Sequence, residues 1–208
     1  MANRTKEIFG DPALIKKVVS KLPFLFQIAE LESSRAGKIG MEVGSLREKI
    51  LISLLIYKFG ESNIETGSIT DPEVDVTVDG SSLSIKTITG KELSGVKIIW
   101  TVDPDKAREF LNSYVPICDI LLVQIYWGDR GGLYFIPLDV QKDVFNSLGR
   151  ERYIKLPKKG TNPRGVELSK EALTKMRLDR RTNVIEIEWK KTHIEFDAYK
   201  RWVDYWKE

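Results

Sequence analysis

Two side chains of opposite charge, Asp75 and Lys86, lie on neighbouring segments that both have the pattern of a β-strand. Residues 74–78 alternate between valine and a polar residue, and residues 83–88 resume the alternation after the turn dipeptide Asp79-Gly80. Because successive side chains of a strand point to opposite faces, the valines share one face with the apolar residues of the second strand. Asp75 and Lys86 should then emerge together on the other face.

A carboxylate and an ammonium held side by side on rigid strands suit the hydrolysis of a phosphodiester bond. Carboxylates can hold a divalent cation, which polarises a phosphoryl oxygen and lowers the pKa of a bound water. A nearby ammonium orients that water and stabilises the charge that develops on phosphorus. Magnesium keeps several of its own waters and needs only one or two protein carboxylates. Asp75 and one further acid would therefore suffice.

The strongest helix pattern of the chain precedes the hairpin and carries a second acid. We expect this helix to begin after Gly44-Ser45, to run from Leu46 to Phe59 and to end at Gly60. Ser45 can cap its first turn, and Glu48 then occupies the capping-box position three residues later.

This combination resembles the PD-(D/E)XK nuclease superfamily. Asp75 matches the acidic residue of its second strand, and Ser84-Ile85-Lys86 matches the E/D-x-K triplet of its third strand. The segment from Gly44 to Glu48 is similar to the helix opening of archaeal Holliday-junction resolvases, in which a glutamate binds metal. The resemblance implies that Glu48, Asp75 and Ile85 form the metal site. It also implies that Lys86 is the catalytic lysine, with Ser84 counted among the catalytic residues.

The sequence departs from the superfamily pattern at two positions. Ser84 stands where the triplet usually has an acid, and Pro72 lies three residues before Asp75 rather than next to it. Because the triplet lacks its acid, Glu48 is the first candidate for the second metal-binding carboxylate. Two other carboxylates, Glu42 and Glu73, remain alternatives for the same role.

Within the superfamily, the size and layout of the chain resemble type II restriction endonucleases, in particular ThaI-like enzymes. This resemblance implies a Mg²⁺-dependent, sequence-specific cut of double-stranded DNA at a short palindromic site, with Mn²⁺ as a substitute metal. A palindrome matches two-fold protein symmetry, so we expect a homodimer. A structure-selective nuclease such as a Holliday-junction resolvase is one alternative. A non-catalytic DNA-binding protein on a decayed nuclease fold, suggested by Ser84, is the other.

The charge distribution indicates where DNA would bind. The formal net charge is only +3, but residues 150–191 contain 13 Lys/Arg against 6 Asp/Glu, a net +7. A turn with Asn162 and Arg164 could read bases, and Met41 could wedge between base steps, although ordinary surface and buried roles fit these residues too. The side chains expected to contact phosphates are Lys158, Lys159, Arg177, Arg180 and Arg181.

The remaining patterns predict an α/β or α+β fold, in which helices flank a mixed central β-sheet with a restriction-endonuclease-like core. We expect one nuclease domain over 1–208, built from N-terminal helices (1–40), a catalytic core (44–148), the basic region (150–191) and a C-terminal helix (194–208). Helices are expected at 12–19, 22–31, 104–114, 138–148 and 169–178, and the last aromatic segment, 196–206, should pack back as a helix. Further strands are expected at 96–102, 117–127, 133–136 and 182–189, with a turn at Gly131-Gly132 and a flexible connection over 33–40.

Several classes of protein are excluded by composition. Cys118 is the only cysteine and His193 the only histidine, so internal disulfides, cysteine-based zinc sites and histidine metal clusters do not apply. No apolar stretch approaches the ~20 residues of a membrane span, and the N-terminus lacks a signal-peptide core. We therefore expect a cytoplasmic protein with no membrane association. Gln124, on the strand after the lysine strand, either faces the site or simply ends a strand.

Overall fold

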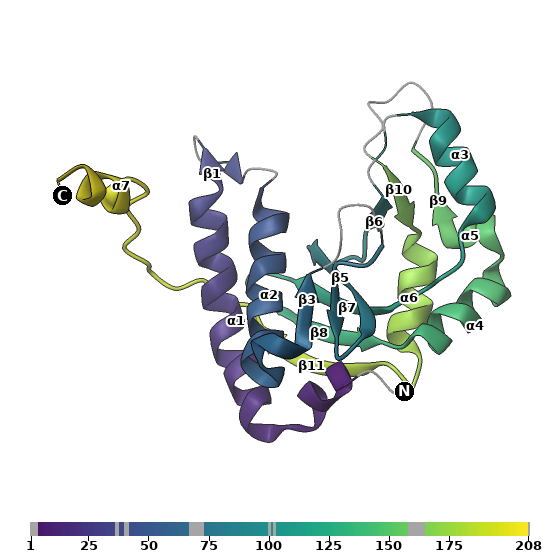
Figure 1. Cartoon of the computed structure of the whole chain (residues 1–208), viewed down its shortest axis with the longest axis horizontal. Coiled ribbons are helices and arrows are strands. Elements are labelled where there is room, and N and C mark those ends of the chain that lie inside the picture. The colour runs from purple at the N-terminus through teal and green to yellow at the C-terminus, as the bar shows by residue number, and fades with distance from the viewer. Residues whose placement is uncertain are drawn as a thin grey trace.

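The computed structural model describes residues 4–35, 38–39, 42–66, 73–99, 101, 103–157 and 165–207 of the chain. A mixed sheet forms the middle layer, with α1 and α2 on one face and α4 and α6 on the other (Figure 1). This arrangement confirms the expected mixed sheet flanked by helices. None of the described helices is long and apolar enough to cross a membrane.

The central sheet has six strands among the described residues, in the order β11-β8-β7-β5-β4-β3. Strands β5 and β7 are parallel, and the other neighbours in this sheet are antiparallel. Its strands are β3 (Ile64–Thr66), β4 (Val76–Val78), β5 (Ser81–Thr89), β7 (Asp119–Ile125), β8 (Arg130–Ile136) and β11 (Asn183–Glu188). A smaller sheet joins β6 (Val96–Ile99), β10 (Val166–Leu168) and β9 (Ile154–Lys155), and a short ribbon pairs β1 (Ser34–Arg35) with β2 (Lys38–Ile39).

The helices are α1 (Pro12–Glu32), α2 (Val43–Phe59), α3 (Pro104–Ser113), α4 (Leu138–Leu148), α5 (Arg150–Tyr153), α6 (Lys170–Leu178) and α7 (Lys200–Lys207), with 3₁₀ turns at Arg4–Gly10 and Glu61–Asn63. The side chain of Asp11 caps α1, accepting hydrogen bonds from the backbone N–H groups of Ala13 and Leu14. Ser169 caps α6 in the expected way. The two apolar segments expected at 12–31 form one continuous helix that passes through Pro23.

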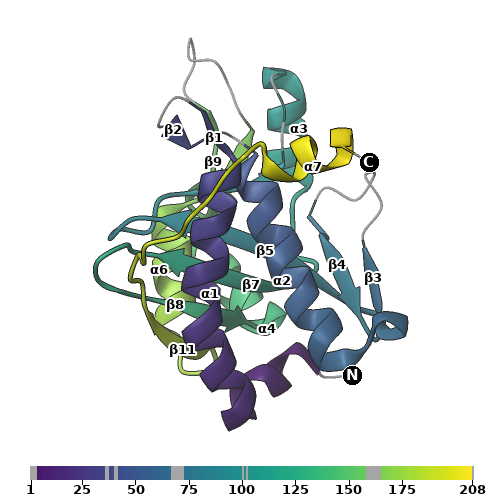
Figure 2. The ribbon, with the colours of Figure 1, turned by 90° about the vertical axis from the view of Figure 1, so that its left-hand side faces the viewer.

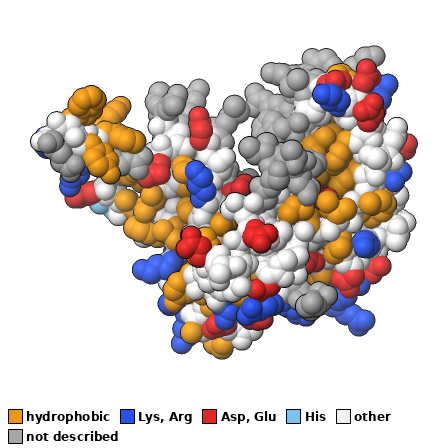
Figure 3. All heavy atoms as spheres, viewed as in Figure 1, with side chains coloured by type: hydrophobic (Ala, Val, Ile, Leu, Met, Phe, Trp, Pro, Cys, Tyr) orange, Lys and Arg blue, Asp and Glu red, His pale blue; other side chains and the backbone are white. Residues whose placement is uncertain are grey.

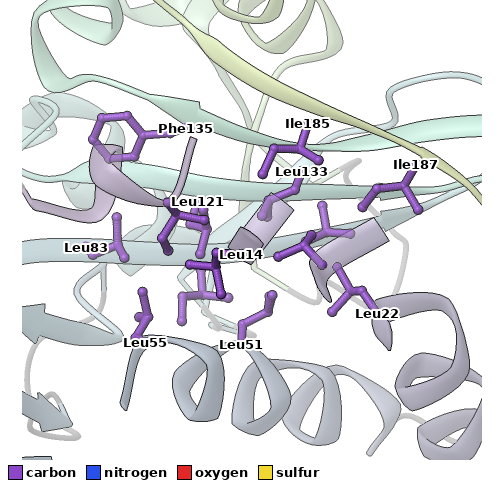
Figure 4. Packing of buried hydrophobic residues seen from close by; sticks show 14 of the residues in the cluster. Leu14, Leu22, Leu51, Leu55, Leu83, Leu121, Leu133, Phe135, Ile185 and Ile187 are labelled. Atoms are coloured by element: carbon purple, nitrogen blue, oxygen red, sulfur yellow. The ribbon is translucent and has the colours of Figure 1, made fainter. Parts of the chain in front are cut away.

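Two hydrophobic cores lie on opposite faces of the sheet. Figure 4 shows the first core, where Leu14 and Leu22 of α1 and Leu51 and Leu55 of α2 pack onto the sheet. The second core lies between the sheet and the helices α3 to α6.

Four sequence expectations are wrong in detail. Helix α2 begins at Val43, so Ser45 lies inside the helix rather than at its cap. The C-terminal segment does form a helix, α7, but it stands away from the body instead of packing back (Figure 1). The connection after α1 contains the β1–β2 ribbon in its described part rather than loop alone.

The fourth error concerns the glycine pair at 131–132, which lies inside β8 and makes no turn. The chain reverses before it, at Gly128, which has a φ of +88°. A Cβ atom on Gly131 would lie 2.1 Å from the main-chain oxygen of Gln124 and 2.7 Å from Nε1 of Trp189. Gly131 is therefore required by a close approach of backbone and indole, and not by a turn conformation.

Replacing Gly131 by alanine should lower the free energy of unfolding by about 1–3 kcal/mol or more, because overpacking against a backbone oxygen cannot be relieved by a rotamer change. The measurement is urea unfolding. Gly10→Ala is the matched control, since a Cβ there meets nothing within 4 Å, and it should change stability by less than about 0.5 kcal/mol. Equal unfolding midpoints for Gly131→Ala and wild type would contradict the close-approach account.

Candidate active site

The β4–β5 hairpin brings Asp75 and Lys86 into direct contact, as the alternation predicts. The turn residues Asp79 and Gly80 both have positive φ, at 48° and 75°, the conformation of a tight two-residue hairpin. The register pairs Val76 with Leu83, and the Nζ atom of Lys86 lies 3.1 Å from Oδ2 of Asp75. Their side chains are only 14% and 21% exposed, so this ion pair is partly shielded from water.

The Asp75 carboxylate is held by three donors from the neighbouring strand. Its Oδ2 atom accepts hydrogen bonds from the backbone N–H of Ile85 at 2.6 Å, from Oγ of Ser84 at 3.2 Å and from Nζ of Lys86 at 3.1 Å. Ser84 is fully buried. The serine that replaces the usual acid of the triplet therefore orients the remaining acid.

Glu48 reaches the same place from α2. Burial raises the pKa of the Glu48 carboxyl above its ordinary value, and the negative charge of Asp75 raises it further, while Lys86 and Lys49 oppose the shift. Glu48 and Lys86 line one open cleft of about 520 Å³. A cation would stabilise the charged form of Glu48 beside Asp75, because it would offset the repulsion between the two carboxylates.

The other wall of the cleft contains residues that the sequence did not single out. Ser94, Gly95, Val96 and Lys97 line it before and within β6, and Glu167 lines it from β10. The paired register places Glu167 opposite Lys97. These residues come from segments about 10 and 80 positions beyond the triplet, and no local pattern connects them to it.

The two reserve acids lie elsewhere. Glu73 is buried, and one of its oxygens accepts a hydrogen bond from the Tyr114 hydroxyl at 2.7 Å. Glu42 is exposed at the N-terminal end of α2. Neither residue is among those that line the cleft, so the structure favours Glu48 as the second carboxylate.

A buried ion pair fixes α2, the helix that carries Glu48. The guanidinium of Arg47 lies 2.6 Å from Oε1 of Glu30 on α1, and it donates a second hydrogen bond to Oγ1 of Thr89 at the end of β5. Trp127 donates to the same Glu30 oxygen at 2.7 Å. Burial lowers the pKa of the Arg47 guanidinium, while the charge of Glu30 opposes this effect. Arg47 thus ties α2 to both α1 and β5, the strand of Lys86.

The donor set fits a hard divalent cation such as magnesium. Glu48 offers carboxylate oxygens, the ligands that such ions prefer, on the wall of the cleft, and Asp75 offers its own beside Lys86, which also lines the cleft. Among the described residues, no group of three or more His, Cys, Asp or Glu side chains is placed so that it could hold a metal ion. The site therefore suits a cation that keeps part of its water shell, and does not suit a closed cage of protein ligands.

The expected DNA-contacting residues are only partly within the described structure. Met41, Lys158, Lys159, Asn162 and Arg164 lie outside the described residues. Of the arginines on or just after α6, Arg180 is exposed, whereas Arg177 donates a hydrogen bond to the buried Gln124 and Arg181 forms ion pairs with Asp139, Asp143 and Asp179. Their contact with phosphates stays a prediction.

Gln124 has a structural role and does not face the cleft. Its side-chain amide donates hydrogen bonds to the carbonyl oxygens of Gly90 and Lys91, and its oxygen accepts from Arg177. It is 4% exposed. Gln124 therefore ties the chain after the lysine strand to α6.

A mixed sheet with this hairpin, helix glutamate and lysine defines a nuclease of the restriction endonuclease fold. Comparison with known proteins gives the particular family: the family model "Restriction endonuclease ThaI" matches residues 8–208, so the chain belongs to the ThaI restriction endonuclease family. It is a type II site-specific deoxyribonuclease.

A solved structure agrees with this assignment. A chain described as "Restriction endonuclease in complex with substrate DNA" is 59% identical to this one, with a TM-score of 0.94 and 99% of both chains covered. No curated protein matches the sequence. Enzymes of this kind generally use divalent metal ions.

The raised pKa of Glu48 predicts how stability depends on pH in the metal-free protein. Because the folded state favours the protonated carboxyl, wild type should lose stability relative to Glu48→Gln as pH rises through the unfolded-chain pKa and on through the folded-state pKa. The two proteins should unfold at equal urea concentrations below about pH 4, where an unfolded-chain glutamate is protonated. Glu48→Gln should be the more stable protein at neutral pH.

Glu42→Gln, which removes an exposed acid at the start of the same helix, is the control and should not reproduce this pH-dependent gain. A Glu48→Gln variant that is less stable than wild type at neutral pH without metal would contradict the proposed crowding of carboxylates.

Proposed function

We propose that Asp75 and Glu48 bind one Mg²⁺, for which Mn²⁺ can substitute, and that Lys86 acts beside them in the cleavage of double-stranded DNA. The observation that carries this proposal is the 3.1 Å contact of Asp75 with Lys86, the lysine that lines one cleft together with Glu48. When bound, the cation supplies Lewis-acid polarisation of the phosphate and a more acidic bound water.

Asp75, Ile85 and Lys86 have different roles at the proposed site. Asp75 is held with its carboxylate fixed by Ser84 and by the Ile85 amide, which limits the orientations in which it can offer its other oxygen. The Ile85 side chain is buried in the core, so any contribution of Ile85 to the metal site is made by its main chain. Lys86 holds a positive charge at the cleft, where it orients the attacking water and stabilises the charge on the phosphate.

The proposed substrate is a short palindromic site in duplex DNA, cut by a homodimer in the cytoplasm. The solved relative's complex with substrate DNA supports the duplex, and the basic segment 150–191 offers the charge for phosphate contacts. The family match to a restriction endonuclease favours site-specific cutting over the junction-resolvase alternative. A plasmid digest should accordingly give discrete fragments, and not selective cutting of branched DNA.

Replacing Lys86 or Asp75 by alanine should reduce the cleavage rate at saturating Mg²⁺ by at least about 10³-fold, because a positioned charge or proton-transfer group of this kind contributes roughly 10²–10⁴. Gel assays of plasmid cleavage give the rate. Binding of the same DNA in Ca²⁺ should weaken by less than about tenfold, since neither residue belongs to the basic segment 150–191.

Lys142→Ala is the matched control, since it removes an exposed lysine from α4, and it should cut at the wild-type rate. Either site variant cutting within tenfold of wild type would contradict the assignment of the site. Specific binding without hydrolysis by the wild-type protein, in both Mg²⁺ and Mn²⁺, would instead support the decayed-fold alternative.

A further inference from the structure

The C-terminal arm, residues 189–207, leaves the body of the protein from a fixed point. The side chain of Gln27 on α1 clamps the backbone of Thr192: its Nε2 donates to the Thr192 oxygen at 2.6 Å, and its Oε1 accepts from the Thr192 N–H at 2.9 Å. Gln27 is buried. Beyond this clamp the arm passes the C-terminal end of α1 and ends in α7, which stands off the α1–α2 layer (Figures 1 and 2).

The helix at the end of the arm, α7, has a capped N-terminus but is short. The Asp197 carboxylate caps it by accepting from the N–H groups of Tyr199 and Lys200, at 2.8 and 3.1 Å. It contains eight residues, whereas isolated helices shorter than ~12–15 residues are marginal in water. A helix of this length is stable only if one of its faces is packed against something.

That face is aromatic and exposed. Tyr199, Trp202, Val203 and Trp206 follow the i, i+3, i+4, i+7 spacing of a single stripe. Tyr199 is 74% exposed, Trp202 53%, Tyr205 67% and Trp206 90%. Figure 3 shows apolar side chains gathered on the protruding arm. Since each such side chain can bury about 150–250 Å², roughly 500 Å² of aromatic surface per arm faces solvent.

The hollow beside the arm is mostly acidic and is formed in part by α7 itself. It measures about 500 Å³, and its lining includes the acids Glu32, Glu195, Asp197 and Asp204 together with Lys200 and Trp202. The helix contributes Lys207 as a further basic residue. One surface thus combines an apolar stripe with charges of both signs, which makes it complementary to a second copy of itself.

We propose that two copies of this chain join through their arms, with α7 of each copy seated in the hollow of the other. Roughly 500 Å² of aromatic surface on each of two arms, and a similar area on the surfaces that cover them, gives roughly 2,000 Å² in total. This reaches the ~1,200–2,000 Å² of stable protein interfaces. The structural match of the solved relative covers 99% of this chain and so includes α7. The inference deepens the proposed homodimer by naming its surface.

The test is the oligomeric state of the full chain, measured by sedimentation velocity without DNA or metal. Wild type should be a dimer at micromolar concentration, and Trp202→Gln/Trp206→Gln should dissociate with a Kd at least 100-fold higher. Glu195→Lys should weaken the dimer at least tenfold. Leu178→Gln, which removes an exposed leucine from α6, is the matched control and should dimerise as wild type does. Circular dichroism verifies that each variant is folded.

Three results would overturn the proposal. The first is a monomeric wild type, including one whose arm folds onto its own body and shields Trp206 from a fluorescence quencher. The second is a tryptophan variant that dimerises as tightly as wild type. The third is loss of the dimer in Tyr57→Glu, which alters the apolar groove between α1 and α2, without loss in Glu195→Lys, because α7 would then be seated in that groove.

Failure of the nuclease proposal would give a different pattern. The mass measurement needs neither DNA nor metal, so it can support the dimer even if no cleavage occurs. If the wild type does cleave, the tryptophan variant keeps its catalytic residues and should nick one strand of a plasmid at concentrations where wild type makes linear product. Equal linear product from a variant shown to be monomeric would show that cutting both strands does not depend on the dimer joined by the arms.

Discussion

The hydrogen bonds that the Asp75 carboxylate accepts from the neighbouring strand are the constraint on which the site depends. Three donors, from Ser84, Ile85 and Lys86, converge on one oxygen. They can do so only in the register set by the Asp79-Gly80 turn, because a slip of one residue would turn Lys86 to the opposite face of the sheet. The conformation of the Asp79-Gly80 turn therefore determines whether Asp75 and Lys86 can meet at the site.

The second carboxylate depends on how α2 sits on the sheet. A buried ion pair such as Arg47–Glu30 pays a desolvation cost and is weak support for stability, so its value here is geometric. Arg47 bonds at once to α1 and to Thr89 on the strand of Lys86, and Glu48 is the next residue along the helix. The same contacts that orient α2 thus set the distance between Glu48 and the hairpin.

Sequence reasoning succeeded where the information was local. Alternation and a turn dipeptide were enough to place Asp75 beside Lys86, and capping residues located α1 and α6. It failed where contacts between segments distant in the sequence determine the structure. Gly131 is required by its close approach to Gln124 and Trp189, and it makes no turn. Lys97 and Glu167 line the cleft only because the fold brings their strands beside it. The aromatic spacing of residues 196–206 predicts a helix that packs against the body, but α7 stands away from it. Helical spacing shows that one face of a helix is apolar and does not show what covers that face.

The most direct test of the account is calorimetric titration of Mn²⁺ into the protein bound to uncleaved DNA containing a non-hydrolysable linkage. Asp75→Asn and Glu48→Gln should each weaken Mn²⁺ binding at least tenfold. The double variant should lose less than the two single losses combined, because both carboxylates bind one ion. Wild-type Mn²⁺ affinity in either single variant, or fully independent losses, would show that these two carboxylates do not share a cation.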